Sequence, residues 1–263
     1  MFQSQPSKGM LALAAMSLIT GSTASPETCE SSTPFSCSSS SAEPTCCFNS
    51  PGGALLLTQF WDTDPSTGPK DSWTIHGLCL SLPSRPDNCD GTYEASCDSK
   101  RSYSNITAIL QDQNLGDLVD YMDEYWVDMN GDNEDFWSHE WNKHGTCINT
   151  IEPTCYSDYK AQEEVGDYFQ KTVELFKSLD TYTALDAAGI TPSTSKTYSL
   201  SEIQEALTDM HGASVYLGCS SGELNEAWYF YNVKGNAVDG TYKPVETLTD
   251  SSCPKTGIKY LPK

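Results

Sequence analysis

The sequence lacks an apolar run long enough to span a bilayer, and it is poor in positive charge. It has 15 lysines and arginines against 36 aspartates and glutamates, which gives a formal net charge of −21. Proteins that stay bound to nucleic acid neutralise phosphates with lysine and arginine, so this balance argues against such a protein. An enzyme that meets a polyanion briefly is still allowed. Carboxylates with ordinary pKa values of about 3.9–4.3 lose much of their charge in acid.

The N-terminus has the pattern of a secretory signal. Lys8 precedes an apolar run from Met10 to Thr20, and small residues follow up to Ser25. The run is too short for a transmembrane helix but suits a signal peptide that is cleaved after Ala24. A disordered tail is the alternative. We therefore expect a signal peptide at 1–24, one catalytic domain at 25–263, and a protein that is secreted or delivered to a vacuole-like compartment.

Cysteine is abundant, but no two cysteines have the spacing that is typical of a metal site. The chain has eleven cysteines, all beyond residue 24, and no Cys-x-x-Cys pair. This density in an exported chain predicts a disulfide framework rather than a zinc site. An odd number leaves at least one thiol unpaired. Asn105 begins an Asn-x-Thr sequon, which predicts N-glycosylation of that residue.

The periodicity of apolar residues predicts an α+β domain. Strands are expected at 54–61, at 73–76 with an end at Gly77, at 214–218 and at 227–234. Helices are expected at 115–126, 134–144, 165–179 and 199–210, the last with a capping box at Ser199. Strands at both ends and helices between them favour one antiparallel β-sheet packed with several α-helices and stapled by disulfides.

Residues 136–147 concentrate the chemistry of the chain, which has only four histidines. On a helix, Glu140, Lys143 and His144 share one face, with His139 at its edge. His76 lies upstream, in Thr-Ile-His-Gly-Leu. Two imidazoles can exchange a proton, while an ammonium and a carboxylate stabilise developing charge. This set suits attack of a neighbouring hydroxyl, such as the RNA 2′-hydroxyl, on a phosphodiester.

A zinc peptidase is excluded by spacing. Its His-Glu-x-x-His motif places two histidines four residues apart on one helix face. In this chain the second histidine, His144, comes five residues after His139, and Lys143 stands in the ligand position. We expect no metal and no cofactor.

The segments 74–78 and 136–147 resemble the two active-site segments of the ribonuclease T2 family, secreted endoribonucleases that tolerate acid. The likeness extends over nearly the whole mature chain and includes Cys46-Cys47 and residues 167–170 and 189–192. It implies a metal-independent enzyme, expected to be monomeric, that cleaves single-stranded RNA with low base specificity through a 2′,3′-cyclic phosphate. By position, His76 and His144 would be the acid and base, Glu140 and Lys143 would stabilise the transition state, and His139 would bind phosphate.

The resemblance also implies a base site and a set of disulfides. The base site would comprise Asp87, Tyr93 and Gln59. The disulfides would join Cys29 to Cys47, Cys37 to Cys89, Cys46 to Cys155, Cys97 to Cys147 and Cys219 to Cys253, which leaves Cys79 as the free thiol.

The sequence departs from the family directly after the first histidine motif. Where the family has one base-stacking tryptophan, this chain has the seven residues Cys79 to Arg85. Stacking on an aromatic side chain is worth about 1–3 kcal/mol, so substrate binding is expected to be weaker. Two hypotheses follow from this departure: the segment arises from the gene model or splicing, or the chain is a catalytically impaired secreted toxin or signalling module of the same fold. The retention of all four catalytic residues favours the enzyme.

Overall fold

The computed structural model describes residues 25–38, 45–50, 53–80 and 95–263. Its main sheet has the strand order β3-β2-β7-β9-β5, and β6 and β8 also pair with β7. Pairing is antiparallel except between β7 and β9. The strands of this sheet are β2 (Ala54–Phe60), β3 (Thr74–Leu80), β5 (Thr197–Tyr198), β6 (Tyr216–Ser220), β7 (Glu223–Lys234), β8 (Thr241–Pro244) and β9 (Ile258–Lys259). A second, small sheet pairs β1 (Ser25–Pro26) with β4 (Tyr156–Ser157).

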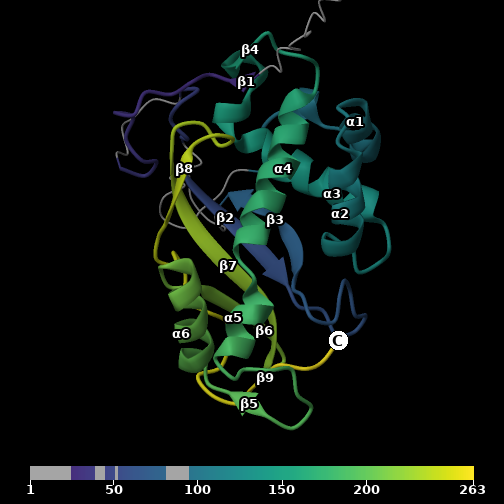
Figure 1. Cartoon of the computed structure of the whole chain (residues 1–263), viewed down its shortest axis with the longest axis vertical. Coiled ribbons are helices and arrows are strands. Elements are labelled where there is room, and N and C mark those ends of the chain that lie inside the picture. Colours follow the sequence, from purple (N-terminus) through teal and green to yellow (C-terminus); the bar gives the residue numbers. More distant parts are fainter. Residues whose placement is uncertain (1–24, 39–44, 51–52, 81–94) are drawn as a thin grey trace, which may run out of the picture.

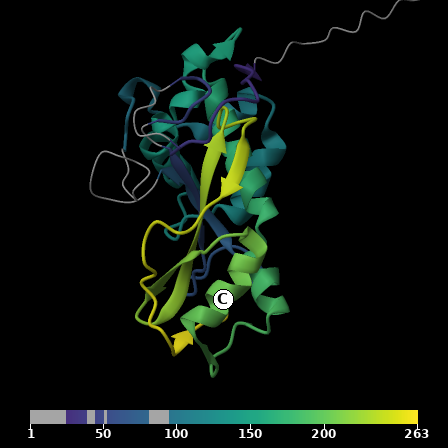
Figure 2. The same ribbon diagram turned by 90° about the vertical axis from the view of Figure 1, so that its left-hand side faces the viewer.

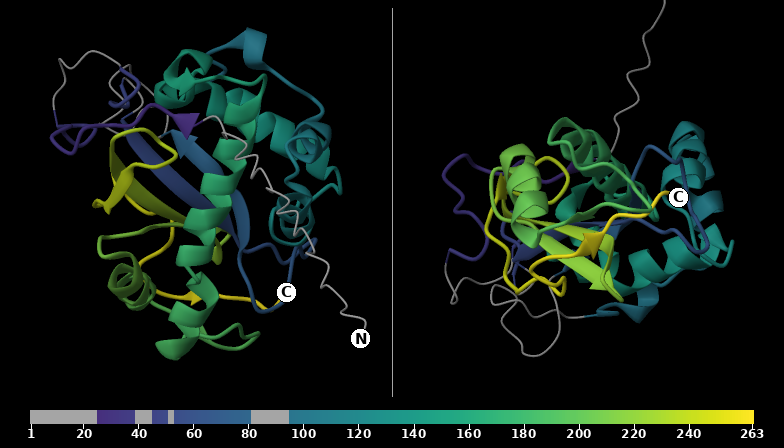
Figure 3. Two further views of the ribbon diagram at one scale, coloured as in Figure 1. Left: turned by 45° about the horizontal axis from the view of Figure 1, so that its top comes forward. Right: turned by 90° about the horizontal axis from the view of Figure 1, so that it is seen from below.

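The helices cover one face of the main sheet (Figures 1 and 2). The α-helices are α1 (Ile106–Asp112), α2 (Gly116–Tyr125), α3 (Asn133–Lys143), α4 (Glu163–Ser178), α5 (Thr181–Ala187) and α6 (Leu200–His211). The 3₁₀ turns are η1 (Ser99–Arg101), η2 (Gly145–Cys147), η3 (Asn149–Ile151) and η4 (Pro153–Cys155). Figure 3 shows α4 crossing β2 and β3, with α1 to α3 grouped to one side.

Strand β2 reads as a continuous apolar run because it is buried on both faces. Leu55 and Leu57 belong to the large core beneath the helices. Leu56, on the opposite face, packs in a smaller cluster with Trp228 and Phe230 of β7. Both faces therefore exclude water, which explains why β2 lacks the alternation of a half-exposed strand.

Four disulfides lie within the described residues, and they join the pairs that the family resemblance implied. They are Cys29–Cys47, Cys46–Cys155, Cys97–Cys147 and Cys219–Cys253. Cys37 is also disulfide-bonded, but its expected partner, Cys89, lies outside the described residues. The fold is thus α+β, rich in antiparallel pairing and cross-linked, as predicted.

The structure corrects several expected elements. β3 does not end at Gly77 but continues to Leu80, and β7 begins four residues earlier than expected, at Glu223. The short helices α1 and α5 were not predicted, because helices of this length depend on tertiary packing rather than on a long periodic pattern. The expected signal segment at 1–24 lies outside the described residues. Within the described ranges, no helix is long and apolar enough to cross a membrane.

The predicted capping box of α6 is confirmed and offers a test of local stability. The Ser199 hydroxyl accepts from the Glu202 N–H at 3.2 Å, and the Glu202 carboxylate accepts from the Ser199 N–H at 2.8 Å. Ser199→Ala should lower the free energy of unfolding by about 1 kcal/mol, measured by urea denaturation. Glu205→Gln, at an exposed position of the same helix, should change it by less than about 0.5 kcal/mol. Equal effects of the two substitutions would contradict the role of the cap.

Candidate active site

His76 is the extra residue of a β-bulge in β3. Thr58 of β2 pairs with Gly77, but the next residue, Gln59, pairs with Ile75, so His76 has no partner across the ladder. The Thr58 hydroxyl lies 3.1 Å from both the N–H and the carbonyl oxygen of Gly77, and it binds the backbone groups displaced by the bulge. Because bulges redirect side chains and occur often beside active sites, this one explains how a strand residue reaches the site.

Aromatic rings fix the plane of the His76 imidazole. Phe60 stacks on it with ring centroids 4.2 Å apart and an angle of 15° between the planes. The ring centroid of Phe136 of α3 lies 6.1 Å from that of His76. The imidazole Nε2 is 3.5 Å from Oε1 of Glu140, and the His76 side chain remains 27% exposed. One edge of the ring thus meets a buried carboxylate while solvent still reaches the side chain.

Side chains of α3 hydrogen-bond to backbone groups in the segments around η1 and after α2. The indole N–H of Trp137 donates to the carbonyl of Trp126 at 2.8 Å, and that of Trp141 donates to the carbonyl of Arg101 at 2.7 Å. The Asn142 amide bonds to both backbone groups of Tyr103. These bonds fix the rotation of α3 about its axis, which turns Glu140 toward β3.

Glu140 is fully buried between α3 and β3. Burial by itself would raise the pKa of this carboxyl, but the imidazoles of His76, His144 and His139 outweigh it and hold the pKa below its ordinary value. The space for the carboxylate exists only because residue 77 is glycine: a Cβ there would lie 1.9 Å from Oε2 of Glu140. Gly77, which follows His76, is therefore required sterically by Glu140 of the segment 136–147.

His144 caps the C-terminal end of α3, where its backbone N–H donates to the Glu140 carbonyl at 3.0 Å. The side chain is buried. Burial lowers the pKa of His144 to about 4, and the charges of Lys143, His76 and His139 act in the same direction against the opposing effect of Glu140. The imidazole is therefore neutral in weak acid and can accept a proton.

The turn after His144 is equally constrained. A Cβ at Gly145 would lie 2.3 Å from the indole ring of Trp141, and Cys147 is bonded to Cys97. Of the remaining predicted residues, Lys143 is half-buried and His139 is exposed. The structure thus brings His76, Glu140, Lys143 and His144 into one electrostatic group, with His139 at its solvent side.

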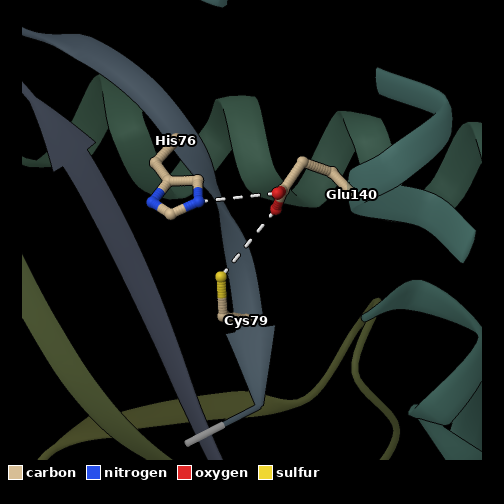
Figure 4. Close-up of side chains that lie close together, drawn as sticks. All are labelled: His76, Cys79 and Glu140. Atoms are coloured by element: carbon tan, nitrogen blue, oxygen red, sulfur yellow. Dashed lines mark hydrogen bonds and ion pairs between the residues drawn. The ribbon is translucent and has the colours of Figure 1, made fainter. Parts of the chain in front are cut away.

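Cys79 lies beside this group as a buried free thiol (Figure 4). Its sulfur is 3.8 Å from Oε2 of Glu140 and 3.7 Å from the hydroxyl oxygen of Thr58. Burial, reinforced by the Glu140 carboxylate, raises the pKa of the thiol well above its ordinary value. The protonated thiol is therefore the resting form in the absence of a bound cation.

One predicted base-site residue is contradicted. Gln59 is fully buried on the face of β2 opposite Phe60. Its amide nitrogen donates to the Leu179 carbonyl at 3.1 Å, and its oxygen accepts from the Thr181 hydroxyl at 2.6 Å. Both polar ends are thus used within the core, so Gln59 is a structural residue. Asp87 and Tyr93 lie outside the described residues.

Several residues of the site were not predicted from the sequence. Thr58 and Phe60 sit in an apolar strand, and only the pairing of β2 with β3 gives them their contacts with the site. Two partly buried carboxylates, Asp62 and Glu226, are also close enough to be influenced by a charge on His76, and burial raises the pKa of each. Asn105, the predicted glycosylation site, is exposed.

Several known proteins are similar to this chain. The sequence profile of the Ribonuclease T2 family matches residues 52 to 245. The chain is 60% identical to Ribonuclease T2 of Aspergillus oryzae over 97% of its own length and 91% of that protein. It is 59% identical to Ribonuclease M of Aspergillus phoenicis, over 90% and 98% of the two chains.

A solved structure extends this similarity to three dimensions. The crystal structure of Actibind, described as a T2 ribonuclease, superimposes with a TM-score of 0.86 at 60% identity, covering 91% of this chain and 99% of that one. With a family profile over most of the chain and relatives of this identity, the conclusion is direct. The chain belongs to the Ribonuclease T2 family.

Proposed function

We propose that this protein is a secreted endoribonuclease that cleaves single-stranded RNA without a metal ion. The observation that carries the proposal is the buried Glu140 carboxylate, which contacts His76 of β3 and lies one helical turn before His144, the C-cap of α3. Membership of the Ribonuclease T2 family supports the reaction class. We further propose that the chain is exported as a monomer and glycosylated at Asn105.

The two histidines have opposite tasks in the proposed reaction. Neutral His144 removes the proton of the RNA 2′-hydroxyl, and the oxygen attacks the adjacent phosphorus. The bond from phosphorus to the 5′-oxygen then breaks, and protonated His76 gives its proton to that oxygen. The products are a 2′,3′-cyclic phosphate and a free 5′-hydroxyl; slower attack of water opens the ring to a 3′-phosphate. The burial of His144, which keeps its imidazole neutral, supports its assignment as the base.

The charged neighbours act on the phosphorus centre. The Lys143 ammonium stabilises the negative charge that develops on the phosphoryl oxygens. Glu140 holds the His76 imidazole in position and assists the same transition state. His139, exposed at the edge of α3, is suited to bind a phosphate of the chain.

The base site is proposed to be weaker than in relatives that keep the stacking tryptophan. Asp87 and Tyr93 remain the proposed contacts, and Gln59 is removed from the set because it faces the core. Low base specificity is part of the proposal, since an aromatic side chain such as Tyr93 can stack on any base. A non-catalytic module of the same fold is the competing function, and the intact acid–base group argues against it.

Turnover of polyuridylate provides the main test. With EDTA present at about pH 5, the protein should produce uridine 2′,3′-cyclic phosphate, because the substrate carries its own nucleophile. His144→Phe should reduce the rate by at least about 100-fold, the lower range for loss of a general base, with an unchanged circular dichroism spectrum. Absence of cyclic product from the wild type would favour the non-catalytic module, and abolition of turnover by EDTA would indicate a metal-dependent nuclease.

The pKa of His144 predicts the acid limit of activity. Below about pH 4 the imidazole is protonated and cannot act as a base, so kcat/KM should fall as the pH drops through about 4. The sign follows from burial, which disfavours the charged form and moves the limit below the ordinary histidine value. The measurement is a pH profile of kcat/KM on a dinucleotide substrate. An acid limb centred near the ordinary value of about 6.5 would contradict the buried base.

The clearance at Gly77 predicts a second effect on activity. Gly77→Ala should displace the Glu140 carboxylate, lowering kcat at least about tenfold and stability by about 1–3 kcal/mol through overpacking. Gly116→Ala is the matched control, because no atom lies within 4 Å of the added Cβ at that position. A Gly77→Ala variant with wild-type kcat would show that the position of Glu140 does not matter for catalysis.

A further inference from the structure

Three potential ligand atoms lie close together at the edge of the site, two of them on residues of the proposed acid–base group and the third on Cys79. They are Nε2 of His76, Sγ of Cys79 and a carboxylate oxygen of Glu140, all within 4.8 Å of one another (Figure 4). Imidazole, thiolate and carboxylate are the three side-chain donors that zinc takes in proteins. Cys79 is the thiol that the family resemblance leaves unpaired, and the structure shows it as a buried free cysteine.

The spacing of the three atoms suits a tetrahedral cation. Bonds of about 2.0–2.3 Å at a tetrahedral angle require about 3.4 Å between nitrogen and oxygen ligands and about 3.6 Å between sulfur and oxygen. His76 Nε2 lies 3.5 Å from Oε1 of Glu140, and Cys79 Sγ lies 3.8 Å from the other oxygen, Oε2, of the same carboxylate. With one carboxylate oxygen in the set, the three ligand atoms lie within 4.8 Å of one another, so they must draw together by up to about 1.2 Å to reach tetrahedral zinc distances.

A second observation points to a missing partner at this place. Glu140 is fully buried, yet its Oε1 makes no hydrogen bond that satisfies normal geometry. A buried carboxylate oxygen ordinarily has such a bond. The His76 side chain is 27% exposed, so solvent reaches one member of the set.

We propose that His76, Cys79 and Glu140 form a zinc site that inhibits the enzyme reversibly. Zinc replaces the proton of the Cys79 thiol, which is released to solvent, and binds neutral His76 and the Glu140 carboxylate. Two negative ligands then balance the two charges of the ion. The nearby Lys143 ammonium opposes the cation and limits its affinity. The inhibition rests on the proposed function, because zinc bound to His76 prevents it from donating a proton. The binding of zinc itself does not depend on the proposed function.

Cobalt binding tests the site without RNA. Metal-free protein titrated with Co²⁺ should develop a thiolate-to-cobalt charge-transfer band in the near ultraviolet, and Zn²⁺ should displace it. Cys79→Ser should lose the band and bind zinc at least about tenfold more weakly, since even loss of an outer-shell partner can cost that much. Cys79→Ala serves as a second variant, and circular dichroism shows whether each is folded.

Activity measurements test the consequence. Zinc should inhibit polyuridylate cleavage by the wild type, and excess EDTA should restore it, each rate being compared with the same variant without metal. A chain in which one tryptophan replaces Cys79 to Arg85 should need at least about ten times more zinc, because it lacks the thiol. Equal zinc affinity of the wild type and Cys79→Ser, or no charge-transfer band in the wild type, would overturn the site. Binding without inhibition would overturn the inhibitory role alone, and absence of turnover before zinc is added would instead count against the proposed function.

Discussion

The burial of one carboxylate between a helix and a strand organises the functional half of this molecule. An ionised Glu140 in the core is costly unless charges and dipoles face it, and His76 supplies the contact at 3.5 Å. The carboxylate needs a residue without a side chain opposite, which Gly77 provides. It also needs a helix that cannot rotate, which the indole bonds of Trp137 and Trp141 secure. The two signature segments are therefore one packing unit.

The β-bulge makes that unit reactive. In a regular ladder, successive side chains alternate between the faces of the sheet, and a one-residue shift reverses every orientation. The extra residue at His76 interrupts the alternation locally and lets its imidazole stack on Phe60 while it points at Glu140. The residues of β3 on either side of the bulge, such as Ile75 and Leu78, stay buried in the core. The histidine can thus be partly exposed while the strand around it stays buried.

Membership of the Ribonuclease T2 family accounts for the scaffold but not for every residue around the site. Cys79 extends the polar group by a thiol that contacts Glu140 and Thr58. The same tight packing that positions the carboxylate brings this sulfur close to two other potential metal ligands, the His76 imidazole and the Glu140 carboxylate. Close donors of mixed type favour a soft or borderline cation.

The sequence by itself determined the fold class and the chemistry-bearing segments, because these depend on local pattern and motif order. The pairing of Cys29, Cys46, Cys97 and Cys219 was implied only by the family resemblance, since sequence spacing does not fix disulfide connectivity. It indicated the helices α2, α3, α4 and α6 to within about two residues at most ends, since amphipathic periodicity is a local property. Only the tertiary structure decided that Gln59 faces the core rather than a base, that β3 continues past Gly77 and that Phe136 approaches His76. Each of these depends on which strand or helix lies opposite, and such contacts join residues far apart in the sequence. The physical reason is that periodicity specifies the face of an element, whereas the partner of that face is specified by packing.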